Sequence, residues 1–67
     1  MYENLISEMA RLGIAKRDIA SCLGIHENTV AYKMNHGSFS VEEAFKIKHS
    51  FFKNYELEYL FHRVLSA

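Results

Sequence analysis

One stretch of the sequence decides the fold: Ile19-Ala20-Ser21-Cys22-Leu23-Gly24-Ile25-His26-Glu27-Asn28-Thr29-Val30. Its first five residues place apolar side chains on one face of a helix, and Gly24 follows directly. Glycine readily takes the left-handed conformation that ends helices, so a helix is predicted to stop there. Val30 and Met34 then lie four residues apart on the inner face of a second helix. Two short helices joined by a glycine turn cross steeply and expose the outer face of the second.

The residues before this stretch predict one further helix. Leu5, Met9 and Leu12 recur at helical spacing, so a helix is expected from Glu3 to Leu12, with Gly13 as its stop. The helix that contains Ile19 then begins at about Lys16 and ends at Leu23.

The residues after the stretch predict two more helices. Ser40 and Glu43 have the spacing of a capping box, and Phe39 and Ala44 occupy the hydrophobic-staple positions. The fourth helix that follows carries a broad apolar stripe, expected to be largely buried: Val41, Ala44, Phe45, Ile47, Phe51 and Phe52. Asn54 is predicted to cap a fifth helix with an apolar stripe of Leu57, Leu60, Phe61, Val64 and Leu65.

The composition favours one all-α domain over residues 1–67, a compact bundle of about five short helices. The 67 residues include no proline and only three glycines, too few turn signals for strands and hairpins, and 49% of them are hydrophobic. No apolar run approaches the roughly 20 residues that span a bilayer, and no signal peptide is recognisable. With the single Cys22, expected to be a small buried residue, these features predict a cytoplasmic protein without membrane association.

The charge balance argues against nucleic acid when taken alone. Eight Lys and Arg balance eight Asp and Glu, whereas DNA-binding proteins usually carry a basic excess. The four histidines can add positive charge near phosphate, because an imidazole takes up a proton near neutral pH. His26 and His36 lie closest to the predicted exposed helix face, so DNA binding is expected to tighten as they become protonated.

The outer face of the third helix has side chains suited to reading bases. Asn28 can pair with adenine through two hydrogen bonds, and Glu27 can accept one from cytosine. Thr29 and Tyr32 add hydroxyl groups and apolar contact. These four residues are the predicted base contacts of a helix inserted into the major groove.

The chain resembles the phage-repressor and Cro-like helix-turn-helix family, also called the XRE family, from about Leu5 to Phe61. The segments that carry the resemblance are Ile14 with Ile19-Ala20 and Leu23-Gly24-Ile25, Thr29-Val30, Lys33-Met34-Asn35, Phe39-Ser40 with Glu43-Ala44 and Ile47, and Leu57-Glu58-Tyr59-Leu60-Phe61. The resemblance implies a lambda-repressor-like fold in which helices 2 and 3 form the helix-turn-helix. It also implies a sequence-specific transcription regulator that binds a double-stranded DNA operator.

The resemblance also assigns contacts to the DNA backbone. Lys16, which opens the second helix, and Asn35, which closes the third, are implied phosphate contacts. Thr29 and Lys33 are implied supporting contacts, and the basic Arg17 beside Lys16 is a further candidate for contact with phosphate. Ala15 stands where the family usually has a Ser or Thr cap. Phage or prophage origin is expected, and with it a place in the cytoplasm of a bacterial host, on the nucleoid when bound to DNA.

Neither an enzyme nor a metal protein is expected. No nucleophile, base and orienting group can be assembled, and no glycine-rich phosphate loop is present. The histidines lack metal-ligand spacing, and the nearest thiol pair, Cys22 and His26, spans the glycine turn. The sequence therefore predicts no catalytic residue, no metal and no cofactor.

Two expectations about protein partners stay open. A single small module offers little interface for tight recognition, so a homodimer is expected, formed through the fifth helix by Val64 and Leu65. The alternative function, favoured by the neutral charge and by Glu27, is a protein-interaction module of the same fold that binds and modulates a partner repressor.

Overall fold

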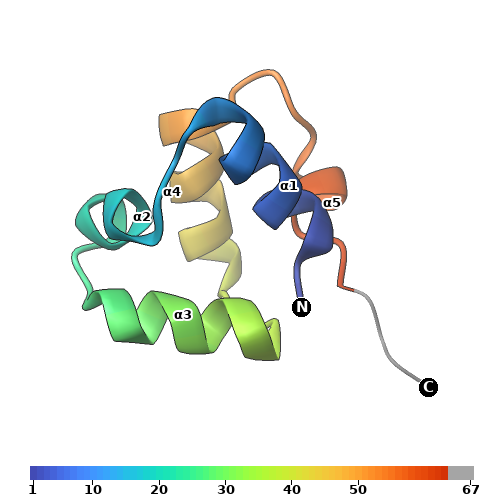
Figure 1. The fold of residues 1–67 in the computed structure, drawn as a ribbon. Coiled ribbons are helices and arrows are strands. Elements are labelled where there is room, and N and C mark those ends of the chain that lie inside the picture. Colours follow the sequence, from blue (N-terminus) through green and yellow to red (C-terminus); the bar gives the residue numbers. More distant parts are fainter. Residues whose placement is uncertain (64–67) are drawn as a thin grey trace.

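The computed structural model describes residues 1–63, which form five helices packed around one core (Figure 1). The helices are α1 (Glu3–Leu12), α2 (Lys16–Leu23), α3 (Glu27–His36), α4 (Val41–Phe51) and α5 (Leu57–Leu60). Residues 1–63 contain no strand. The predicted all-α fold is confirmed, and so are the predicted bounds of α1 and α2.

One hydrophobic core lies between the helices. α2 packs against α3 and α4, while α5 packs against α1 and α4. In Figure 1, α3 runs along one side of the molecule, and the loop between α4 and α5 lies on the opposite side. Every helix contributes a side chain to the fully buried set, which comprises Phe52, Leu5, Ile19, Ile47, Leu60 and Val30.

The turn between α2 and α3 has the conformation that the sequence predicts. Gly24 has a φ of 68°, in the left-handed region that a side chain would strain. The amide of Ile25 donates to the carbonyl of Ala20 at 3.1 Å, which closes the end of α2. Ile25 packs against the core, so the short turn that leads into α3 is anchored to the rest of the protein.

The predicted burial of the whole apolar stripe on α4 is wrong. Val41 is 68% exposed and Phe45 is 47% exposed, whereas Ala44 and Ile47 are buried. The apolar positions cover more of the helix circumference than its contacts with α2 and α5 can bury. The predicted capping box is confirmed, because the amide of Glu43 donates to Ser40 Oγ at 3.1 Å and that of Ser40 donates to Glu43 Oε1 at 2.9 Å.

The fifth helix is shorter than predicted, and Asn54 does not cap it. α5 comprises Leu57–Leu60 only, and Glu56 stands at its N-cap position. Asn54 lies in a turn, in which the amide of Tyr55 donates to the carbonyl of Phe52 at 3.0 Å. The rings of these two aromatic residues meet edge to face, with centroids 5.9 Å apart, so tertiary packing rather than a local cap shapes this segment. The predicted dimer contacts Val64 and Leu65 lie outside the described residues.

A polar cluster that the sequence analysis missed joins α1 to the C-terminal segment. Glu8 is only 8% exposed, and it accepts hydrogen bonds from Tyr59 Oη at 2.8 Å and from Arg11 Nε at 2.9 Å. Arg11 also donates to Tyr55 Oη. The hydrogen bonds from Tyr59 and Arg11 hold the pKa of Glu8 below its ordinary value. These four side chains satisfy one another and act in stability.

Candidate nucleic-acid interface

α3 has one buried face and one exposed polar face. Val30 and Met34 are buried against α2 and the core, as the sequence predicts. Glu27, Asn28 and Tyr32 are exposed, and the Tyr32 side chain reaches 60% exposure. A helix with this division can place its outer face against a partner without disturbing its packing.

Thr29, the remaining predicted base contact, is only partly buried. The structure therefore places all four predicted base-contacting residues on α3, three of them in its first turn and Tyr32 near its middle. They offer carboxylate, amide and hydroxyl groups within two turns of helix.

The first turn of α3 is fixed by His26, a cap that the sequence analysis missed. His26 occupies the N-cap position, and its Nδ1 accepts a hydrogen bond from the amide of Asn28 at 3.1 Å. An acceptor nitrogen carries no proton, so this contact requires an unprotonated Nδ1. Protonation would break the cap as it adds charge, which opposes the tightening of DNA binding expected from His26. Histidine is not among the favoured N-cap residues, so the sequence offered no signal.

Further along α3, Tyr32 contacts His36, the last residue of the helix. The two rings stack with centroids 4.0 Å apart, and His36 Nδ1 lies 2.8 Å from the carbonyl oxygen of Tyr32. A carbonyl only accepts, so His36 Nδ1 carries the proton in this contact. This geometry is compatible with a positively charged ring, in contrast to that of His26.

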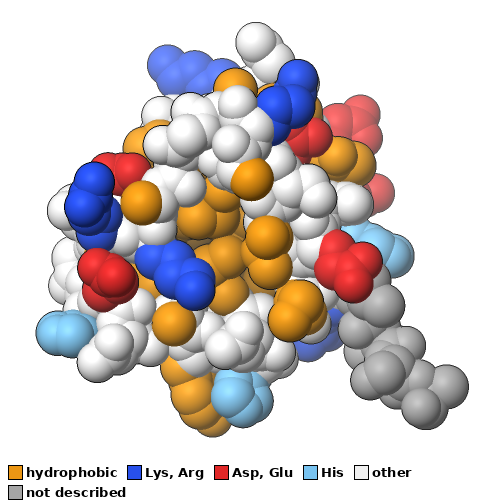
Figure 2. All heavy atoms as spheres, in the orientation of Figure 1, with side chains coloured by type: hydrophobic (Ala, Val, Ile, Leu, Met, Phe, Trp, Pro, Cys, Tyr) orange, Lys and Arg blue, Asp and Glu red, His pale blue; other side chains and the backbone are white. Residues whose placement is uncertain are grey.

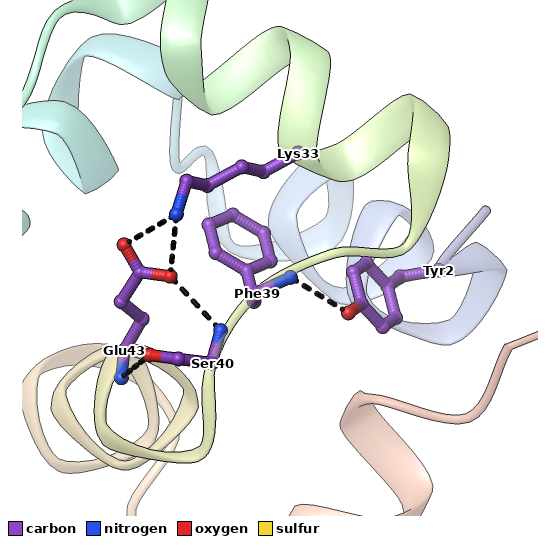
Figure 3. A network of polar contacts seen from close by, with 5 residues as sticks. All are labelled: Tyr2, Lys33, Phe39, Ser40 and Glu43. Atoms are coloured by element: carbon purple, nitrogen blue, oxygen red, sulfur yellow. Dashed lines mark hydrogen bonds and ion pairs between the residues drawn. The ribbon is translucent and has the colours of Figure 1, made fainter.

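Lys33 is engaged within the protein (Figure 3). Its ammonium group donates to both carboxylate oxygens of Glu43, at 2.8 and 2.9 Å. The contact ties α3 to the start of α4, beside the Phe39 amide, which donates to Tyr2 Oη at 3.1 Å. The structure thus engages Lys33 in an ion pair within the protein, and the phosphate contact of Lys33 stays a prediction.

The electrostatics of this pair favour the charged form of the carboxylate. Burial alone would raise the pKa of Glu43, but the hydrogen bonds from Lys33 and from the Ser40 amide outweigh it and leave the pKa below its ordinary value. The sequence could not reveal the pair, since its members lie ten residues apart on different helices.

The other predicted phosphate contacts lie free at the surface. Lys16, Arg17 and Asn35 are all exposed. Lys16 opens α2, Asn35 lies in the last turn of α3, and both line one hollow of about 290 Å³. Within residues 1–63 neither side chain has an ion-pair or hydrogen-bond partner. The fold therefore brings two predicted phosphate contacts together from separate helices.

The start of α2 lacks a side-chain cap, as the alanine at position 15 implies. The amide of Ala15 donates to Asp18 Oδ2 at 2.8 Å, which is half of a capping box. Asp18 is therefore occupied by the backbone and forms no ion pair with Lys16 or Arg17 within the described chain.

The surface around the interface carries mixed charge. Figure 2 shows hydrophobic side chains gathered at the centre of the face, with cationic and anionic side chains scattered around them. Arg11 and Lys33 form ion pairs with carboxylates of the protein. Lys16 and Arg17, the two cationic residues of α2, form no ion pair within residues 1–63 and can contact an external anion. Glu27 opposes them at the start of α3, which limits the electrostatic attraction to a polyanion.

Residues 1–63 contain no group of three or more His, Cys, Asp or Glu side chains that could hold a metal ion. Cys22 is partly rather than fully buried, with its Sγ 3.1 Å from Ser50 Oγ. No helix in this part of the chain is long and apolar enough to cross a membrane.

Comparison of the chain with protein-family models, with curated proteins and with solved structures gave no match. The family resemblance in the sequence therefore stays a prediction, and the case for a function depends on the geometry of α2 and α3.

Proposed function

We propose that the protein is a sequence-specific DNA-binding transcription regulator of the phage-repressor or Cro-like type. In this proposal α2 and α3 act as a helix-turn-helix, and α3 enters the major groove of operator DNA. The observation that carries the proposal is the two-sided α3, with Val30 and Met34 buried beneath an exposed polar face. A major groove about 12 Å wide admits one helix in this orientation.

The exposed residues of α3 have the chemistry for base readout. Asn28 can form two hydrogen bonds with adenine, and Glu27 can accept one from the amino group of cytosine. His26 holds the turn that carries both residues, which limits the ordering cost of binding. Thr29 follows Asn28 in the same turn, and Tyr32 extends the exposed face by one turn.

Lys16, Arg17 and Asn35 are the proposed phosphate contacts. Lys16 and Arg17 begin α2, Asn35 lies in the last turn of α3, and Lys16 and Asn35 lie close enough to line one hollow. Three phosphate contacts predict only modest DNA affinity for one copy of the protein. A homodimer that binds two half-sites of the operator is therefore part of the proposal.

The proposal is tested by a gel-shift titration with the promoter DNA adjoining the gene. Lys16→Ala is compared with Lys53→Ala, a matched control in the turn between α4 and α5, on the opposite side from α3 (Figure 1). Weaker binding for Lys16→Ala alone supports the proposed face. Equal binding by both variants, or no shift by the unaltered protein, contradicts it.

A protein-interaction module that binds a partner repressor is the second candidate. Val41 and Phe45 are exposed on successive turns of α4. The rings of Phe45 and His49 stack with their centroids 6.3 Å apart. Exposed apolar residues of this kind favour a protein partner over DNA. Repeating the gel shift with the neighbouring repressor present separates the candidates. The interaction module would remove the repressor from DNA, and Phe45→Ser would abolish that effect.

A further inference from the structure

The hollow beside the proposed interface has an apolar floor that DNA does not explain. It has a volume of about 290 Å³ and lies between α1, the start of α2 and the end of α3. Five apolar residues line it: Ile6, Met9, Ala10, Ile14 and Met34. Ile6 is 38% exposed, and Figure 2 shows hydrophobic side chains visible at the centre of this face.

The rim of the hollow is polar and supplies hydrogen-bond donors. Lys16 contributes an ammonium group and Asn35 an amide, and neither side chain has a partner within residues 1–63. A backbone phosphate would satisfy these donors but would leave the apolar floor facing water. A ligand that matches both parts needs one anionic group attached to an apolar body.

We propose that this hollow binds a small amphipathic monoanion, a carboxylate carried on an apolar chain or ring. The carboxylate accepts hydrogen bonds from Lys16 and Asn35, and the apolar body packs on the exposed side chains of Ile6 and Ala10. Met9 and Met34 lie beneath them, and methionine side chains adapt their shape readily, which suits a shallow site. The volume lies near the lower end of small-molecule pockets, roughly 300 to 1,000 Å³, so the ligand is small.

Ligand binding would oppose DNA binding at the same residues. Lys16 and Asn35 are the proposed phosphate contacts, and a carboxylate on them excludes a phosphate. The monoanion would therefore release the protein from DNA, as an effector does. This consequence rests on the proposed function, whereas the ligand site itself does not.

The site is tested by titrating the ¹⁵N-labelled protein with octanoate and recording amide chemical shifts. Shifts are expected at Ile6, Ala10, Ile14, Lys16 and Asn35. Three compounds serve as controls. Acetate carries the carboxylate without the long apolar chain, octanol carries the chain without a charge, and octyltrimethylammonium carries the chain with the opposite charge. Each is expected to bind at least tenfold more weakly than octanoate, because acetate loses the apolar contact and the other two lose the charged contact, each of which contributes about tenfold or more. Equal binding of octyltrimethylammonium, or shifts centred on Val41 and Phe45, would overturn the proposal.

Three variants locate the site. Ala10 is exposed on α1, so Ala10→Leu fills the hollow without entering the core and is expected to abolish octanoate binding. Lys16→Gln removes the cation and is expected to weaken octanoate about tenfold. Lys53→Gln removes a distant cation and is expected to change nothing. Unaltered octanoate binding by Ala10→Leu, with its spectrum showing a folded protein, contradicts the assignment.

A second arm separates this inference from the proposed function. DNA affinity is measured with and without saturating octanoate, and a loss of affinity in the unaltered protein but not in Ala10→Leu is expected. Unchanged affinity at saturation refutes the competition. If no DNA binds under any condition, the proposed function fails, while the chemical shifts still decide whether the ligand site exists.

Discussion

The two faces of α3 are fixed by different forces. The inner face is held by packing, since Val30 and Met34 are buried in the core. The outer face is held by local hydrogen bonds, from the Asn28 amide to His26 and between His36 and the Tyr32 carbonyl. Packing therefore sets where the helix lies, and the outer side chains set what it can bind. Stability and recognition are expected to separate when the two faces are altered one at a time.

The largest effect is expected on the inner face. Met34 is 2% exposed, so Met34→Ala leaves a cavity between α3 and the core and should lower the free energy of unfolding by about 2 to 5 kcal/mol. Urea denaturation measures it. The exposed neighbour provides the control, because Asn35→Ala removes no buried contact. Equal stability of the two variants would mean that α3 is not held by its inner face.

The next largest effect is expected on the outer face. Asn28→Ala should weaken binding to the preferred DNA site by about 1 to 3 kcal/mol and leave non-specific binding unchanged, because it removes one base contact. The unfolding free energy should stay the same, since His26 caps the Asn28 amide rather than its side chain. Fluorescence anisotropy on specific and random DNA measures this, with Asn54→Ala as the control. A uniform loss on both DNAs would assign Asn28 to the backbone.

A smaller effect is expected where α3 is tied to α4. Glu43→Gln removes the ion pair with Lys33 and should lower the free energy of unfolding by about 1 kcal/mol at neutral pH. The folded-state pKa of Glu43 is lowered, so its contribution is present above the unfolded value near 4.5 and is lost as the pH falls through the lowered pKa.

Urea denaturation at neutral and acid pH tests this pH dependence. Glu8 also has a lowered pKa and loses its contribution in the same acid range. Glu43→Gln should therefore keep part of the acid sensitivity, and adding Glu8→Gln should remove more of it. A Glu43→Gln variant with the full acid sensitivity of the unaltered protein would show that the pair does not stabilise α3.

The smallest effect compares two lysines that the sequence treats alike. Lys16 is exposed and unpaired within the described chain, so Lys16→Ala should reduce the slope of log affinity against log salt by about 0.9. Lys33 is neutralised by Glu43, so Lys33→Met should leave the slope unchanged. The reverse result would show that Lys33 leaves Glu43 to bind phosphate.

Local signals were sufficient for part of the fold. Gly13 and Gly24 end α1 and α2 as predicted, since their left-handed conformation is a property of one residue and its neighbours. The length of α5 and the exposure of Phe45 were not predictable, because they depend on which helices pack together. The same limit applies to the candidate site. The outward face of Asn28 followed from helical spacing, whereas the Lys33–Glu43 pair required the relative position of two helices.

The central claim is that the exposed face of α3 reads DNA sequence. Selection from a random DNA library, with sequencing of the retained molecules, tests it most directly when the unaltered protein and Asn28→Ala are run in parallel. The account predicts one enriched motif for the unaltered protein and the same motif with preference lost at one base pair for the variant. Retained DNA without any enriched motif, or an identical motif for both proteins, would contradict it.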